Sequence, residues 1–303
     1  MTDFKNAQEL LELCRQRQWM ISEVMKQREC DLSEVPMDQV CFRMQQVLEI
    51  MRASAKTPVK AAVKSMGGLI GGEAKKLTLH RNAGKNICGE VLGHGITYAM
   101  AVLEVNASMG VIVAAPTAGS AGIVPGLLLA LQQEYHISDD RMVDALFHAG
   151  AIGYLAMRNA TVAGAVGGCQ AEVGVAAAMA AAAAVELMGG EPAQSLDAAS
   201  TVLMNMLGLV CDPVGGLVEY PCQNRNAAGV ANALIAAELS LSGVRQLIPF
   251  DEMLDIMYQV GKRIPYELRE TALGGCAASP SGCRHCRPAL SASVTQNDSV
   301  VRF

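Results

Sequence analysis

The chain has 303 residues, of which 51% are hydrophobic, 17% charged and only 4% aromatic, with a formal net charge of −5. This length is sufficient for one large domain or two modest ones with a buried core. The weak negative charge and the scattered Lys and Arg exclude the broad basic surface of a nucleic-acid-binding protein. Ala, Val, Leu, Ile and 17 Met carry the apolar content, and the small residues among them favour closely packed helices.

Hydrophobic residues recur at helical spacing along most of the chain. The pattern begins within residues 5–55, and we expect further helices over residues 86–105, 139–158, 172–188, 195–207, 226–242 and 251–261. Ser195 is the expected N-cap of its helix. Because no alternating strand pattern, repeat or long linker interrupts these segments, the sequence predicts an all-α fold. The predicted domain covers residues 1–285, and residues 286–303 read as an exposed polar tail.

Two stretches have a membrane-like hydropathy. Residues 105–131 contain four Gly and two Pro, which break a spanning helix, and residues 173–188 are mostly Ala with Glu186 inside. Both are better explained as buried segments than as membrane spans. The N-terminus lacks the apolar core of a signal peptide. We therefore expect a cytoplasmic protein without membrane contact.

Two Gly-rich stretches interrupt the helical pattern. Residues 65–73 (SMGGLIGGE) contain four glycines, and these residues alone favour a flexible connector. Residues 114–126 (AAPTAGSAGIVPG) combine hydroxyl groups with glycine before an apolar segment. A loop of small residues that opens a helix offers free N–H groups to an anion, although a plain tight turn explains it equally well. Neither a P-loop nor a dinucleotide-binding fingerprint is present.

Ten cysteines in a cytoplasmic chain do not indicate a disulfide framework, because the cytosol keeps thiols reduced. Cys14, Cys41 and Cys88 have apolar neighbours in helix-like sequence, so we assign them to packing. Cys30 has no predicted role.

Three later cysteines occupy helix ends or turns, in the motifs GGCQAE, VCDPVGG and EYPCQNRN. They are Cys169, Cys211 and Cys222. A helix N-terminus stabilises a thiolate, which suits metal ligation. The contiguous spacing of ferredoxins is absent. From the residues alone, an iron–sulfur site, a zinc site and three buried cysteines all remain open.

Taken together, these motifs resemble the α chain of bacterial iron–sulfur L-serine dehydratases. The match extends roughly from position 10 to 285 and is carried by residues 65–73, 115–126, 159–175, 211–226 and 272–281. The resemblance implies an all-helical catalytic domain with a [4Fe–4S] cluster on Cys169, Cys211 and Cys222. It also implies β-elimination of L-serine to pyruvate and ammonia, in which the iron without a cysteine ligand polarises the C–O bond.

The resemblance leaves the other functional groups as expectations. We expect the substrate to be held by Ser65, Thr117, Ser120, Gly122, Asn224 and Arg225. Arg225 would pair with the serine carboxylate, and a salt bridge to a neighbouring helix is the alternative. His94 and His148 are the only histidines in buried-looking sequence, but each has an ordinary core explanation, so no general base is assigned.

The family further implies a β subunit, and we expect it to supply part of the active site, with the base as a candidate contribution. The apolar composition favours an oligomer. In the C-terminal region, Cys283 or Cys286 could reach the cluster, although a redox-labile surface pair or an accidental Cys-x-x-Cys spacing is favoured. Cys276 has no assigned role. Two alternatives are a related cysteine desulfidase and a non-catalytic metal-binding subunit.

Overall fold

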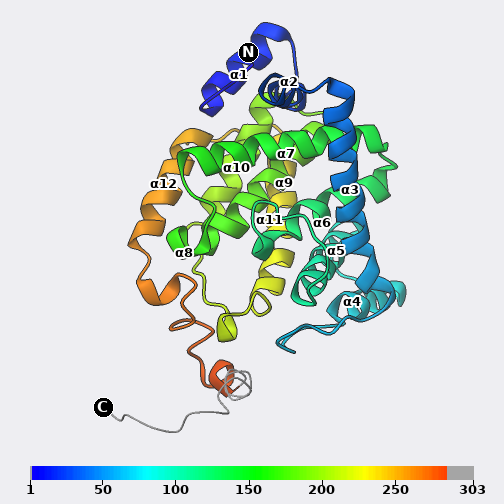
Figure 1. The fold of residues 1–303 in the computed structure, drawn as a ribbon, viewed down its shortest axis with the longest axis vertical. Coiled ribbons are helices and arrows are strands. Elements are labelled where there is room, and N and C mark those ends of the chain that lie inside the picture. Colours follow the sequence, from blue (N-terminus) through cyan, green and yellow to red (C-terminus); the bar gives the residue numbers. More distant parts are fainter. Residues whose placement is uncertain (1, 285–303) are drawn as a thin grey trace.

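The computed structural model describes residues 2–284, and its regular elements are all helices (Figure 1). No β-strand forms within these residues, so the all-α prediction is confirmed. The predicted tail, with Cys286, lies outside the described residues. The α-helices are α1 (Ala7–Arg17), α2 (Ile21–Ser33), α3 (Met37–Lys60), α4 (Glu73–Asn82), α5 (Gly89–Ala107), α6 (Ile123–Tyr135), α7 (Asp139–Asn159), α8 (Gly164–Gly167), α9 (Val175–Leu187), α10 (Pro192–Asn205), α11 (Cys222–Leu241) and α12 (Phe250–Arg263).

Two helices begin a turn or so before their predicted first residues. Helix α10 starts at Pro192, with Glu191 at its N-cap, and Ser195 is fully buried one turn inside. The predicted Ser195 cap is therefore wrong, because proline suits the first turn of a helix and sets the start earlier. Helix α11 starts at Cys222 rather than at residue 226. This start places a cysteine directly at a helix N-terminus.

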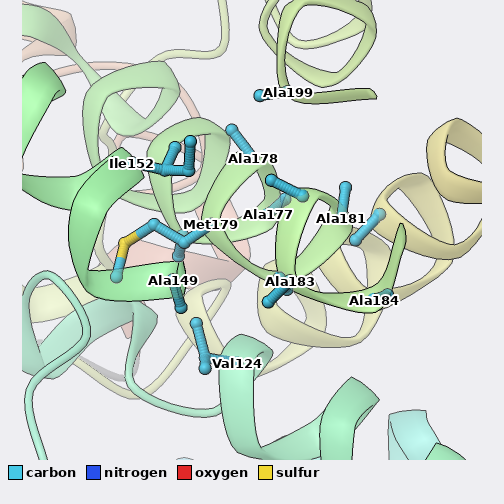
Figure 2. Close-up of a cluster of buried hydrophobic side chains, with 14 of the residues drawn as sticks. Val124, Ala149, Ile152, Ala177, Ala178, Met179, Ala181, Ala183, Ala184 and Ala199 are labelled. Carbon is cyan, nitrogen blue, oxygen red and sulfur yellow. The ribbon is translucent and has the colours of Figure 1, made fainter. Parts of the chain in front are cut away.

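The Ala-rich helix α9 forms the centre of the molecule. Every residue from Val175 to Leu187 is buried, and α9 packs against α6, α7, α10 and α11. Figure 2 shows its alanines facing Ile152 of α7, Val124 of α6 and Ala199 of α10. The segment Gln170–Leu187 is long and apolar enough to cross a membrane, but 94% of it is buried inside the protein. Small side chains let four helices approach α9 at once, so this segment is a core helix, as predicted.

Helices α5 and α6 approach each other at glycines. A Cβ atom on Gly122 would overlap the carbonyl oxygen of Ala99, and one on Gly126 would lie 2.9 Å from the carbonyl oxygen of Gly95. These two positions therefore accept only glycine without a shift of backbone. The close packing fixes the loop that precedes α6.

The functional residues gather where several helix ends meet. Helix α3 runs along one side of the bundle and α12 along the other, with α9 and α11 between them (Figure 1). A short π-helical segment, Gln170–Gly174, leads into α9. This segment and α11 both contact Ala118–Ser120 in the loop before α6, and Asn226 of α11 donates to the Gly119 carbonyl there.

Candidate metal and active site

Three cysteines from separate segments come together. Cys169 precedes the π-helical segment, Cys211 lies in the turn after α10, and Cys222 is the first residue of α11. All three are buried. Cys211 hydrogen-bonds to Cys169, and the charge of Cys169 acts on Cys222. The packing of α9 against α10 and α11 brings these thiols into one group.

The thiols of this group differ in acidity. The hydrogen bond from Cys211, together with the Arg225 guanidinium, holds the pKa of Cys169 below its usual value. The pKa of Cys211 is raised because it is the donor of this bond and is buried. Burial, and then the charges of Cys169 and Glu172, raise the pKa of Cys222 to about 12. Metal binding would release the protons that these thiols carry.

Glu172 links the cysteines to the hydroxyl-rich loop within residues 114–126. Its Oε1 accepts a hydrogen bond of 2.8 Å from Thr117 Oγ1, and its Oε2 lies 3.7 Å from Cys211 Sγ. Thr117 Oγ1 is also 3.0 Å from Ser120 Oγ. A Cβ atom on Gly164 would overlap Glu172 and lie 3.0 Å from Cys211 Sγ. Glycine at position 164 therefore leaves room for these two groups. Burial raises the pKa of the Glu172 carboxyl.

Arg225 borders the cysteines from α11. Its Nη2 lies 2.7 Å from Asp212 Oδ1, and its Nη1 donates to the Val210 carbonyl at 2.9 Å. Its guanidinium also contacts Cys169. Arg225 therefore makes a salt bridge to the turn that carries Cys211, whereas the alternative considered from the sequence was a salt bridge to a neighbouring helix.

Of the six expected substrate-binding residues, Arg225 contacts Cys169. Thr117 and Ser120 are connected to Cys211 through Glu172. The Gly122 N–H donates to Asn226 Oδ1 at 3.0 Å, and Asn224 is exposed on α11.

Ser65 organises its own loop. Its hydroxyl donates to Glu219 Oε2 at 2.7 Å, and the same carboxylate accepts the N–H groups of Gly67 (2.6 Å) and Leu69 (2.9 Å). Because Glu219 is only 3% exposed and lies in the turn before α11, it ties the Gly-rich loop to the segment of Cys222. This loop is therefore held by side-chain contacts across the chain.

Four polar residues that the sequence reading did not single out connect the site. Each lies within four positions of a cysteine of the group: Glu172, Asp212, Glu219 and Asn226. Asn226, for example, donates to the Gly119 carbonyl at 2.7 Å and so ties α11 to the hydroxyl-rich loop. Proximity in sequence to a cysteine of the group was the available signal. Glu172 and Asn226 follow a cysteine by about one helical turn, which returns to the same face, whereas the other two lie in the turns that carry or precede a cysteine.

A second group of possible metal ligands, Glu90, His94 and Glu134, involves α5 and α6. His94 Nδ1 lies 3.0 Å from the Glu90 carbonyl and 3.1 Å from Glu134 Oε1. Its Nε2 lies 2.8 Å from Gln133 Nε2. Both ring nitrogens thus have partners within the protein. Gly95, which follows His94, contacts Val230 of α11. Val230 lies about two helical turns, about 12 Å, beyond Cys222 along α11.

His148 lies at the other end of the core helix. Its Nδ1 is 2.5 Å from Glu186 Oε2. Glu186 lies about 25 Å from Cys169 along the helical segment that begins after this cysteine. Neither buried histidine is therefore at the cysteine group.

The remaining cysteines only partly match their predictions. Cys14 is buried in the core as expected, and Cys41 packs against it in part. Cys88 is exposed at the N-cap of α5, so its assignment to packing is wrong. The apolar residues around it in the sequence turn inward only once α5 begins. Cys276 is partly buried and Cys283 exposed.

The fold and site thus define an all-helical protein with a buried three-thiol group at the meeting point of helix ends. Residues 16–277 match the family described as Serine dehydratase alpha chain. A probable L-serine dehydratase alpha chain of Bacillus subtilis is 47% identical over 92% of this chain and 93% of the relative. The L-serine dehydratase alpha chain of Peptoniphilus asaccharolyticus is 44% identical over 91% and 94%. L-serine dehydratase TdcG of Escherichia coli is 36% identical over 91% and 62%.

The chain therefore belongs to the serine dehydratase alpha chain family, a family of lyases.

Proposed function

We propose that this protein is the catalytic α subunit of an L-serine dehydratase that converts L-serine to pyruvate and ammonia. The observation that carries this proposal is the convergence of Cys169, Cys211 and Cys222 in a chain of this family. Curated relatives over most of its length are named L-serine dehydratase alpha chains, which supports serine as the substrate.

We further propose that the three cysteines hold a [4Fe–4S] cluster. Thiolates are the ligands that iron–sulfur clusters take from proteins, and the group offers three buried ones from three segments. The Glu90, His94 and Glu134 group offers oxygen and nitrogen ligands instead, which suit a different kind of metal. When bound, the cluster would supply a Lewis-acidic iron to polarise the hydroxyl group of serine.

The side chains beside the cysteines would bind the substrate. Thr117 offers a hydroxyl group, and the Glu172 carboxylate beside it suits the α-ammonium group of an amino acid. Arg225 retains donors for the serine carboxylate, because a guanidinium carries five N–H groups and its bonds to Asp212 and Val210 do not use them all. These roles place both charged ends of the substrate against oppositely charged side chains.

The proton acceptor in this proposal comes from a β subunit. His94 and His148 are held in hydrogen bonds away from the cysteine group. The words alpha chain in the names of relatives support a partner subunit. We also propose that the protein is cytoplasmic and oligomeric.

The test is anaerobic reconstitution with iron and sulfide, followed by assay of pyruvate from L-serine with and without a candidate β subunit. We expect Cys169→Ser, Cys211→Ser and Cys222→Ser each to lose the visible absorption of the cluster together with pyruvate formation. Cys88→Ser is the matched control, because Cys88 is exposed and outside the group, and it should retain both.

Two results would contradict the proposal. A fully reconstituted cluster that forms no pyruvate even beside the partner would reject serine elimination. Release of sulfide from L-cysteine in place of that activity would favour a desulfidase.

A further inference from the structure

Asp212 uses both of its oxygens to join separate parts of the site. The residue follows Cys211 and is only 2% exposed. Its Oδ1 lies 2.7 Å from Arg225 Nη2, and its Oδ2 accepts the N–H of Cys276 at 2.6 Å. One carboxylate therefore holds a side chain of α11 and the backbone of the C-terminal segment, residues 268–284.

The same C-terminal segment is attached to the backbone of Cys211. The Cys211 N–H donates to the Leu268 carbonyl at 2.8 Å, and the Glu270 N–H donates to the Cys211 carbonyl at 2.7 Å. These two bonds form an isolated parallel bridge. Since both backbone polar groups of Cys211 are used in this way, the orientation of this cysteine depends on the C-terminal segment.

The approach of this segment to Asp212 requires glycine at position 275. Gly275 has a φ of +59°, a left-handed conformation that glycine adopts without penalty. A Cβ atom at this position would overlap the Asp212 carboxylate. The contact between Asp212 and Cys276 therefore depends on a position with no side chain.

Arg225 depends on Asp212 for its place beside the cysteines. Its three contacts are Asp212, the Val210 carbonyl and Cys169. Asp212 is the only carboxylate paired with it among the salt bridges of residues 2–284. A charge-assisted pair directs a guanidinium more strongly than a bond to a neutral carbonyl does.

The anchored segment also forms one wall of a cavity of about 440 Å³. Opposite Cys276 and Ser279, the cavity is lined by Leu69 of the Gly-rich loop, Val214 and Tyr220. Release of Cys276 from Asp212 would move this wall.

We propose that Asp212 is a positioning residue of the site, which orients Arg225 beside Cys169 and anchors the C-terminal segment to the Cys211 turn. The first role rests on the proposed function, because Arg225 there binds the serine carboxylate. The second role is a property of the chain itself.

Three variants separate the two roles. Asp212→Asn keeps an oxygen for the Cys276 N–H but removes the charge that directs Arg225. Gly275→Ala displaces the C-terminal segment and leaves the charge of Asp212 unchanged. Asp212→Ala removes both contacts. Asp197→Asn is the matched control, because Asp197 forms a 2.8 Å ion pair with Arg245 on another part of the protein.

Hydrogen exchange measured by mass spectrometry on the metal-free chain tests the anchor. We expect exchange in peptides covering residues 268–278 to be about tenfold to a hundredfold faster in Asp212→Ala and Gly275→Ala, the range for loss of a hydrogen bond to a charged group. Asp197→Asn should keep the exchange of the parent protein. Asp212→Asn should give a smaller increase than Asp212→Ala, because its neutral oxygen still accepts the Cys276 N–H. Unchanged exchange in both Asp212→Ala and Gly275→Ala would overturn the anchor.

Kinetics of the reconstituted enzyme with its partner test the role toward Arg225. We expect Asp212→Asn to raise the KM for L-serine about tenfold or more with a smaller change in kcat, since a misplaced Arg225 weakens carboxylate binding. An unchanged KM in an active Asp212→Asn enzyme would overturn this role. If even the parent protein forms no pyruvate, the proposed function and the role toward Arg225 fail together, and the exchange result still decides the anchor.

Discussion

The buried pair His148 and Glu186 shows how single residues stabilise this fold. The two side chains are 0% and 10% exposed, and their closest atoms are 2.5 Å apart. Burial raises the pKa of Glu186, but His148 and Ser22 outweigh it and hold this pKa below the usual 4.5. The carboxylate is therefore stabilised in its ionised form, although it lies between α2, α7 and α9.

Removal of His148 should destabilise the protein strongly. We expect His148→Leu to lower the free energy of unfolding by about 3–5 kcal/mol at pH 7, because it leaves the Glu186 charge buried without its partner. Urea unfolding followed by circular dichroism measures this change. The double variant His148→Leu with Glu186→Leu should recover a large part of the loss, and a double variant as unstable as the single one would contradict the argument.

The stability of the parent protein and that of His148→Leu should respond to acid in opposite directions. In the parent protein the lowered pKa of Glu186 contributes stability above pH 4.5 that is lost as the pH falls through the folded-state pKa. In His148→Leu only Ser22 still opposes burial, which is the largest influence on Glu186. We therefore expect this pKa to rise, so the variant should instead become more stable as the pH falls from 7 to 4.5. Unfolding measured across this range checks the sign.

At the scale of elements, the close contact between α5 and α6 requires glycine at two positions of the α6 segment. Gly122 and Gly126 let α6 approach the backbone of α5, and Gly122 also donates to Asn226 in α11. These contacts place the hydroxyl-rich loop next to the start of α11. Gly122 and Gly126 belong to the stretch that the sequence offered as an anion-binding loop, and in the structure they serve helix packing.

We expect Gly122→Ala to lower the free energy of unfolding by about 1–3 kcal/mol, because its Cβ atom would overlap the Ala99 carbonyl. Gly150→Ala in α7 is the matched control. A Cβ atom there meets nothing within 4 Å, so the better helix propensity of alanine should stabilise the protein by roughly 0.5–1 kcal/mol. Thermal and urea unfolding of both variants test the pair, and equal effects would refute the packing argument.

At the scale of the whole molecule, the buried cysteine group is joined through Asp212 to a segment that lines a cavity between loops. The Gly-rich loop and residues 213–220 line the cavity beside Cys276, and Tyr220 is partly exposed there. The buried histidines are bonded elsewhere. This arrangement is compatible with a partner that completes the site.

We therefore expect the reconstituted chain alone to form pyruvate at only a small fraction of the rate of the complex. Addition of the β subunit should restore turnover without a change in iron content, which separates a catalytic contribution from cluster stabilisation. Paired assays of pyruvate and iron measure both quantities. Full activity in the isolated chain would reject this prediction.

The sequence by itself determined most of the helices and the central place of the Ala-rich segment. Hydrophobic periodicity is local, so a window of one or two turns predicts both a helix and its buried face. Hydrophobic periodicity did not predict helix α4, because Ala74 is its only buried residue. The sequence also placed Cys169, Cys211 and Cys222 at helix ends or turns, and the family resemblance then implied that they are ligands of a cluster.

Only the tertiary structure decided which side chains meet at those cysteines. Glu172 lies beside Thr117, Asp212 between Arg225 and Cys276, and Glu219 beside Ser65. Each contact joins segments far apart in the chain, and its geometry depends on how α5, α6, α9 and α11 pack. A motif records which groups are present, whereas the distance between groups on different helices follows from the packing of the whole core.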